Sequence, residues 1–215
     1  MKVSMKKHIY TVTAVLTGVL VGVLAAVNPF YALDSYLTDG LYTKLTGPSS
    51  DIIIIGVDEE TLAEYGNFNL WSREKSAALL EYLYEDTDNA PAVVGMDFMF
   101  ISDYDRETDA RLAKAVGDNT VMGTNLVYRG ALERDPSGRL IYNTEHIADI
   151  EVPYEELAKA ATLGFTNACI ASDGCVRYAL LDVDIPEEIS ERNTDNSIGE
   201  GIHESFDKAV LDAYM

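Results

Sequence analysis

Residues 51–73 read DIIIIGVDEETLAEYGNFNLWSR, and residues 92–109 read AVVGMDFMFISDYDRETD. Each stretch begins with an apolar run typical of a strand that is buried on both faces. Each run ends in a carboxylate, Asp58 in the first and Asp97 in the second. A helix-length segment separates the two runs, so they predict neighbouring parallel strands of an α/β domain.

Helical and extended patterns alternate through the middle of the chain. Residues 73–84 and 105–116 place apolar side chains at helical spacing, and residues 120–127 predict a third strand. A parallel β-α-β-α-β core with right-handed crossovers follows from this order. Residues 164–170 and 175–183 flank a Ser-Asp-Gly turn and predict an antiparallel hairpin. The predicted fold class is therefore α/β with a mixed sheet.

The N-terminal segment has a different pattern. Residues 11–27, TVTAVLTGVLVGVLAAV, contain no charged residue, and the apolar character continues to Leu33. A helix over residues 10–33 would span roughly 30 Å, enough for the hydrocarbon core of a membrane. Three lysines precede it, which by the positive-inside rule places the N-terminus in the cytoplasm. A cleaved signal peptide is the alternative, but residues 25–27 and 30–32 are poor cleavage sites, so we predict a transmembrane helix.

The organisation of the chain follows from these patterns. After the apolar segment, leucines and a tyrosine recur at helical spacing up to a Gly-Pro pair, which predicts a helical stalk. We predict a cytoplasmic tip and transmembrane anchor over residues 1–33 and a stalk over 34–50. Residues 51–215 would form one extracytoplasmic domain, with the whole protein at the cell membrane.

The composition excludes several classes of function. The formal net charge is −20, so nucleic acid and anionic lipid surfaces would be repelled. The sequence contains no phosphate loop, no dinucleotide fingerprint and no Gly-x-Ser-x-Gly motif. Its three histidines are isolated from one another and form no zinc motif. We therefore predict no cofactor and no nucleic-acid partner.

Five polar or aromatic residues are predicted at one edge of the sheet. Asp58 and Asp97 end adjacent strands, and ligands of open α/β sheets bind at the carboxyl ends of strands. Trp71 and Arg73 belong to the loop over that edge, and Asn125 comes from the third strand. Two interpretations stay open. The five residues line a ligand pocket, or Arg73 pairs with Asp58 or Asp97 while Trp71 covers the end of the sheet.

An acidic cluster, Asp103, Asp105 and Asp109, lies near the start of the second predicted helix. Hard cations prefer several carboxylates, but this cluster lacks the glycine and the terminal glutamate of a calcium loop. Acidic residues at a helix N-terminus are already favoured by the helix dipole. The sequence therefore predicts no metal site here.

Cys169 and Cys175 flank the predicted hairpin turn. A five-residue connection would place them opposite each other, where an oxidising compartment allows a disulfide. A two-residue turn would pair residue 172 with Cys175 and leave both thiols free. The sequence leaves both outcomes open.

The order of these motifs resembles a known family, the CHASE type-two domain (cyclase- and histidine-kinase-associated sensory extracellular). The resemblance covers residues 34–214. It rests on the segments LDSYLTDGLY, DIIIIGVDEETLAEYG, WSREKSAALLEYL, VVGMDFMFISDYDRETDARLAKAV, GFTNACIASDGCVRYALL and ESFDKAVLDAY. Residues 69–73 depart from the Pro-Trp-Pro-Arg type sequence of the family, and Tyr178 stands where a second basic residue often occurs.

The resemblance implies a function. Domains of this type sense signals outside the cell for receptors whose output domain is an adenylate cyclase, a histidine kinase or another signalling enzyme. We therefore expect a non-catalytic sensor for an unknown small ligand or partner protein, with a homodimer formed through the stalk. Two alternatives are an envelope-anchored hydrolase that uses Asp58 and Asp97, and a scaffold that only dimerises.

Overall fold

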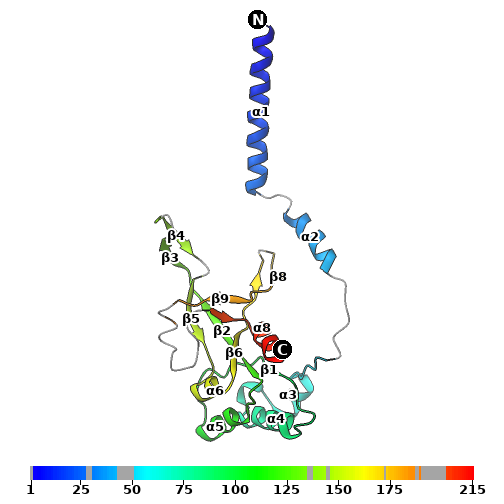
Figure 1. The fold of residues 1–215 in the computed structure, drawn as a ribbon, viewed down its shortest axis with the longest axis vertical. Helices are drawn as coiled ribbons and strands as arrows, with labels where there is room; N and C mark the ends of the chain where they lie inside the picture. The colour runs from blue at the N-terminus through cyan, green and yellow to red at the C-terminus, as the bar shows by residue number, and fades with distance from the viewer. Residues whose placement is uncertain are drawn as a thin grey trace. The chain divides into compact units, whose positions relative to one another are not determined.

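The computed structural model describes residues 2–27, 31–42, 51–134, 138–143, 146–171, 173–186, 189 and 202–215. These residues form two compact units, and the chain divides between Val57 and Asp58. The first unit contains helices α1 (Lys2–Val27) and α2 (Tyr31–Tyr42). The second unit contains the sheet and all other helices (Figure 1).

The predicted transmembrane helix over residues 10–33 is wrong. In the described part of the chain, no helix combines the length and the apolar character needed to cross a membrane. The prediction required one continuous apolar helix, whereas α1 ends at Val27 and begins among the N-terminal lysines. The next helix starts at Tyr31 and has Asp34 in its first turn. The predicted homodimer through residues 34–50 stays a prediction.

The predicted strand over residues 52–57 is also absent. The segment belongs to no strand, and Ile53 and Ile54 expose 85% and 88% of their surface. A β-branched run has strand propensity, but a strand forms only where its backbone groups pair with a neighbour. None of the described strands pairs with this segment.

The second unit begins with helices and one short strand. Helix α3 (Glu59–Tyr65) and a 3-10 turn, η1 (Phe68–Leu70), precede α4 (Glu74–Glu85). Strand β1 (Val94–Met96) and helix α5 (Arg106–Ala115) follow, then the nine-residue strand β2 (Thr120–Tyr128). The order after that is β3 (Ala131–Arg134), β4 (Leu140–Asn143), β5 (Ile147–Glu151), α6 (Glu155–Ala160), β6 (Thr162–Phe165), β7 (Cys169–Ile170), β8 (Val176–Tyr178), β9 (Asp182–Asp184), β10 (Ile202–Glu204) and α8 (Phe206–Tyr214).

Strand β2 organises a mixed sheet, as the α/β prediction requires. It pairs in parallel with β1 and β6, and in antiparallel with β5. Helix α5 connects β1 to β2, and α6 leads into β6. The parallel part of the sheet therefore begins with β1 and not with the strand that was predicted before Asp58. The other strands form two-stranded pairs, β3 with β4, β7 with β8, and β9 with β10.

Two apolar clusters hold this unit together. In one, α4, α5 and α6 cover the sheet with buried side chains that include Leu80, Leu112 and Leu157, packed around Met96 of β1. The other surrounds Leu126 of β2 and includes residues of β5 and β6. Successive residues of a strand point to opposite faces. Since Met96 faces the three helices and the preceding Gly95 faces α8, helix α8 lies on the other face of β1.

Candidate functional site

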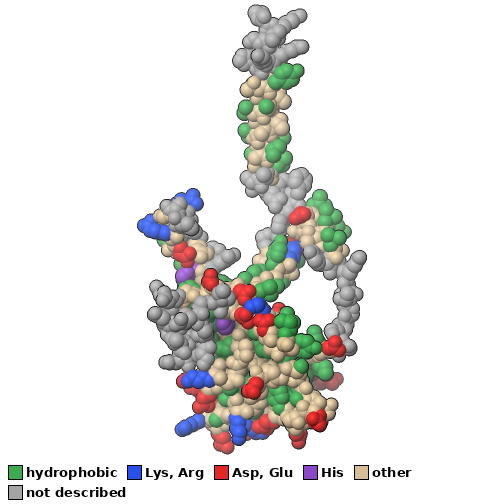
Figure 2. Space-filling view, viewed as in Figure 1, with side chains coloured by type: hydrophobic (Ala, Val, Ile, Leu, Met, Phe, Trp, Pro, Cys, Tyr) green, Lys and Arg blue, Asp and Glu red, His purple; other side chains and the backbone are tan. Residues whose placement is uncertain are grey.

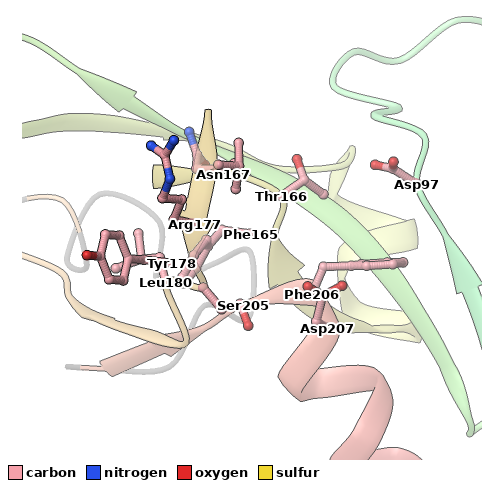
Figure 3. A pocket seen from close by; sticks show the side chains of 13 residues that line it. Asp97, Phe165, Thr166, Asn167, Arg177, Tyr178, Leu180, Ser205, Phe206 and Asp207 are labelled. Carbon is pink, nitrogen blue, oxygen red and sulfur yellow. The ribbon is translucent and has the colours of Figure 1, made fainter. Parts of the chain in front are cut away.

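A pocket of about 390 Å³ lies where β1 and β6 end and α8 begins. Asp97 directly follows β1, and Thr166 and Asn167 directly follow β6 (Figure 3). Hairpin β7–β8 contributes Arg177, and the first turn of α8 contributes Asp207. We call this cavity the α8 pocket. It lies at the carboxyl edge of parallel strands, the position where open α/β sheets bind ligands.

Two glycines allow α8 to lie directly on the sheet. A Cβ atom at Gly164 of β6 would come within 2.6 Å of the Phe206 Cα atom. A Cβ atom at Gly95 of β1 would come within 2.9 Å of the Phe206 ring. Ser205 caps the helix by accepting a hydrogen bond from the Lys208 backbone N–H at 3.2 Å. This close packing determines where the first turn of α8 meets the pocket.

Hydrogen bonds to β2 fix the residues that follow β6. The backbone N–H of Thr166 donates to the Thr124 carbonyl at 2.9 Å. The Asn167 side chain accepts from the Leu126 N–H at 2.7 Å and donates to the Leu126 carbonyl at 2.9 Å. It therefore continues the pairing of β6 with β2 after the strand ends. These bonds hold the floor of the pocket in place.

His203 of β10 lies behind this floor and is buried. Its Nε2 atom lies 3.1 Å from the Thr124 hydroxyl, and its ring centroid lies 5.9 Å from that of Phe165. Burial lowers the pKa of His203, and the neighbouring Glu204 opposes this shift. The imidazole therefore favours its neutral form, and it connects β2 to the strand that leads into α8.

The charged groups of the α8 pocket are not balanced. Arg177 donates two hydrogen bonds of 2.8 Å to the Asp173 carboxylate, and this pairing lowers the pKa of Asp173 to about 2. Asp97 and Asp207 are exposed, and within the described residues neither carboxylate has a hydrogen-bond or ion-pair partner. In Figure 3, Asp97 lies on the side of the pocket away from Tyr178. Asp97 lies next to Gly123 of β2, where an added Cβ atom would lie 3.6 Å from Asp97 Oδ1.

The structure separates the five residues that were predicted to share one site. Asp97 lines the α8 pocket. Asn125 is not part of this lining, but its side chain accepts a hydrogen bond from the lining residue Asn167 at 3.1 Å and donates one to Glu151 at 2.7 Å. Asp58 caps α3 by accepting from the Thr61 N–H and hydroxyl, and these bonds lower its pKa. The Asp58 side chain therefore acts as the N-cap of α3.

Trp71 and Arg73 line a second, smaller cavity of about 200 Å³, the Arg73 pocket, together with Phe68, Phe98 and Phe100. The Trp71 indole donates to the Gly66 carbonyl at 3.0 Å. Its ring packs against Phe68, with 5.2 Å between the centroids. This indole holds together the turn between α3 and α4.

Arg73 has neither of the two carboxylate partners that were considered for it. Its guanidinium is buried, pairs with Asp109 of α5 and donates to the Ser102 carbonyl. The guanidinium also lies over the Tyr154 ring, 4.3 Å from the centroid. Burial raises the pKa of Tyr154 to about 12. The predicted pairing of Arg73 with Asp58 or Asp97 is therefore wrong, because the carboxylate that Arg73 binds is Asp109.

The acidic cluster is divided between structural roles. Asp105 caps α5 by accepting from the Thr108 N–H at 3.0 Å, and Asp109 binds Arg73 and accepts from the Tyr104 N–H at 2.9 Å. Within the described residues, no three histidine, cysteine or acidic side chains are grouped to hold a metal ion. The structure therefore gives Asp105 a capping role and Asp109 an ion pair.

Cys169 and Cys175 are both free thiols. The observed register pairs Cys169 with Tyr178 and Ile170 with Val176, with an irregularity between them. This register differs from the one that places Cys169 opposite Cys175. It also differs from the one that pairs residue 172 with Cys175. It places Cys175 in the turn, away from the position opposite Cys169, so the proposed disulfide does not form in this structure.

Of the residues that line the α8 pocket, the sequence reasoning selected Asp97, and those that it missed include Thr166, Asn167, Arg177 and Asp207. Thr166 and Asn167 lie inside the run of residues 164–170 that was predicted as a strand, whereas β6 ends at Phe165, so the criterion that selected Asp97 did not select them. Asp207 belongs to the first turn of α8 and follows no strand that was predicted from the sequence. It reaches the pocket only because α8 packs back onto the sheet.

An α/β domain with an open pocket at the carboxyl edge of its parallel strands has the layout of a ligand-binding domain. Residues 12–215 match the family model of the CHASE2 domain, so the chain belongs to the CHASE2 domain family. This match confirms the predicted resemblance. CHASE2 domains are sensory extracellular domains of receptors rather than catalytic domains. No curated protein and no solved structure matches the chain.

Proposed function

We propose that this chain is the ligand-sensing part of a signal-transduction receptor, and that occupancy of the α8 pocket is the signal. The observation that carries the proposal is the convergence of three distant segments on one cavity. Asp97 follows β1, Arg177 belongs to the β7–β8 hairpin, and Asp207 starts α8. A molecule bound there would contact all three at once.

The mechanism that we propose is a shift in the position of α8. The helix rests on Gly95 and Gly164 with no spare space, so a change at its first turn is transmitted to its whole length. A ligand moves such an equilibrium only if it binds one position of the helix more tightly than the other. Asp207 and Phe206 would provide that difference in affinity, because both residues line the pocket and both belong to α8, the helix that moves. The output would be a cyclase or a kinase domain of the receptor.

The hydrolase alternative has less support. It needs Asp58 and Asp97 to act together on one substrate. Asp58 is held by Thr61 and is not part of the lining of the α8 pocket. The scaffold alternative gives the α8 pocket no role.

The proposal is tested by screening the chain against small polar metabolites, namely amines, amino acids and organic acids, by nuclear magnetic resonance. We expect binders to shift the signals of Thr166, Asn167 and Asp207. Ala168→Trp, which fills the pocket from its exposed lining, should abolish these shifts. Ala92→Trp, at an exposed position outside the pocket lining, is the matched control. Binders whose shifts map elsewhere and survive Ala168→Trp would exclude the α8 pocket as the sensory site.

A further inference from the structure

We infer that the ligand of the α8 pocket is a small organic cation that carries an amine, an inference that rests on the proposed function. The argument begins with the charges of the pocket. Asp97 and Asp207 are both exposed carboxylates. Within the described residues, neither has a cationic partner. The pocket therefore offers two carboxylates that no cationic side chain among the described residues pairs with.

The one guanidinium of the lining does not reverse this balance. Both terminal nitrogens of Arg177 are bound to the carboxylate of Asp173, at 2.8 Å each. A bidentate pair of this kind already satisfies the geometry that an anionic ligand would need. An anion would have to displace Asp173 and would then lie beside Asp97 and Asp207.

The N-terminus of α8 also gives little support to an anion. The partial positive charge of a helix N-terminus does favour anions. In this helix the first turn already contains Asp207, and Ser205 occupies the Lys208 N–H. The positive end of the dipole is therefore already complemented by side chains of the chain itself.

The walls of the pocket favour an organic cation over a metal ion. Phe206 contributes apolar surface near the carboxylates, and Tyr178 and Leu180 contribute apolar surface on the side of the pocket away from Asp97 (Figure 3). An alkyl ammonium can place its chain on this surface and its charge near an aromatic ring. Hard metal ions need six or more oxygen ligands, or a dense cluster of them. The described residues contain no group of three such side chains.

The charge of the rest of the molecule supports the same class of ligand. The formal net charge is −20, and acidic side chains are spread over the visible face of the second unit (Figure 2). A surface potential of one sign raises the local concentration and the association rate of small ions of the opposite sign. The volume, about 390 Å³, is in the range of small-molecule sites.

The test uses four matched four-carbon probes: butylamine, 1,4-diaminobutane, butanol and butyrate. Each is titrated into the full chain by nuclear magnetic resonance at low ionic strength. We expect the two amines to bind at least about tenfold more tightly than butanol and butyrate, with shifts at Thr166 and Asn167. Ala168→Trp should remove this binding.

Charge variants identify the groups that bind the amine. Asp97→Asn and Asp207→Asn should each weaken amine binding about two- to fivefold, the range for partly exposed ion pairs. Asp118→Asn makes the same change in net charge at an exposed position outside the lining, and should leave the affinity unchanged. A loss that is equal in all three variants would show that net charge alone is responsible, and would overturn the inference.

The remaining outcomes separate this inference from the proposed function. Butyrate or butanol binding as tightly as the amines, and blocked by Ala168→Trp, would overturn the amine class and still support a sensory pocket. Amines that bind without a response to Ala168→Trp would overturn the inference too. Absence of binding by all four probes at millimolar concentration would also overturn it, while the metabolite screen judges the pocket separately.

Discussion

The α8 pocket and the Arg73 pocket each contain an arginine and aromatic rings, but the charged groups around the two arginines are arranged in opposite ways. In the Arg73 pocket the guanidinium is buried, paired with Asp109 and covered by the Tyr154 ring. In the α8 pocket the arginine is paired with Asp173, which lies outside the lining, and Asp97 and Asp207 stay exposed without partners among the described residues. Charges that are buried and paired maintain the fold. Charges that are exposed and unpaired are available to a ligand.

The largest effect should come from breaking the buried ion pair. Arg73→Met would leave Asp109 buried beside an apolar side chain, and such a loss typically costs about 3–5 kcal/mol of unfolding free energy. Urea denaturation measures this change. Arg111→Met removes an exposed pair with Glu81 between the same two helices and is the matched control, with a much smaller expected effect. Equal losses in the two variants would contradict the structural role of Arg73.

The second prediction disturbs the packing of α8. Gly164→Ala would place a methyl group 2.6 Å from the Phe206 Cα atom, a contact that the helix can relieve only by moving. We expect a loss of about 1–3 kcal/mol in urea denaturation, as for overpacked cores. Binding in the α8 pocket should weaken as well, because Asp207 moves with the helix. Gly56→Ala, where the added methyl group meets no atom within 4 Å, is the control.

Helices α4 and α5 could be predicted from the sequence because their apolar residues recur at helical spacing, and the central strand β2 was predicted as well, whereas α3 was not. Three site residues, Asp97, Arg73 and Asp207, show which positions the sequence could predict and which it could not. Asp97 was correctly placed at the carboxyl end of its strand, since that rule depends only on chain order. The partner of Arg73 depends on how α4 packs against α5, and Asp109 lies 36 residues away. The position of Asp207 in the pocket depends on the packing of α8 over Gly164. A glycine in the sequence does not indicate which other segment packs against it.

The third prediction concerns pH and tests whether the floor of the α8 pocket is rigid. Burial lowers the pKa of His203 below its value of about 6.5 in an unfolded chain. Above that pH, His203 is neutral in both states and its contribution to stability is complete. As the pH falls below about 6.5, the unfolded chain binds the proton first, so the unfolding free energy decreases until the folded pKa is reached. One proton limits this slope to about 1.4 kcal/mol per pH unit.

The groups around His203 define the control for this experiment. Glu204 is its neighbour, Asp182 and Asp184 lie on the paired strand β9, and Lys208 binds both Glu204 and Asp182. His203→Gln keeps a group that can bond to Thr124 but does not titrate. Urea denaturation between pH 5 and 8, read as the difference between the two proteins, isolates His203. Parallel pH profiles for the two proteins would contradict the role of its burial.

The smallest effect should come from releasing Arg177, and it tests the comparison of the two pockets most directly. Asp173→Asn keeps the size of the side chain but removes the charge that holds the guanidinium. Arg177 would then contribute its positive charge to the α8 pocket, and we expect butylamine to bind about two- to fivefold more weakly. Butyrate should bind more tightly in the same variant, a reversal that a loss of folding could not produce. Unchanged affinities for both probes would mean that Arg177 is too far from the ligand to matter, and that the lining carboxylates alone select it.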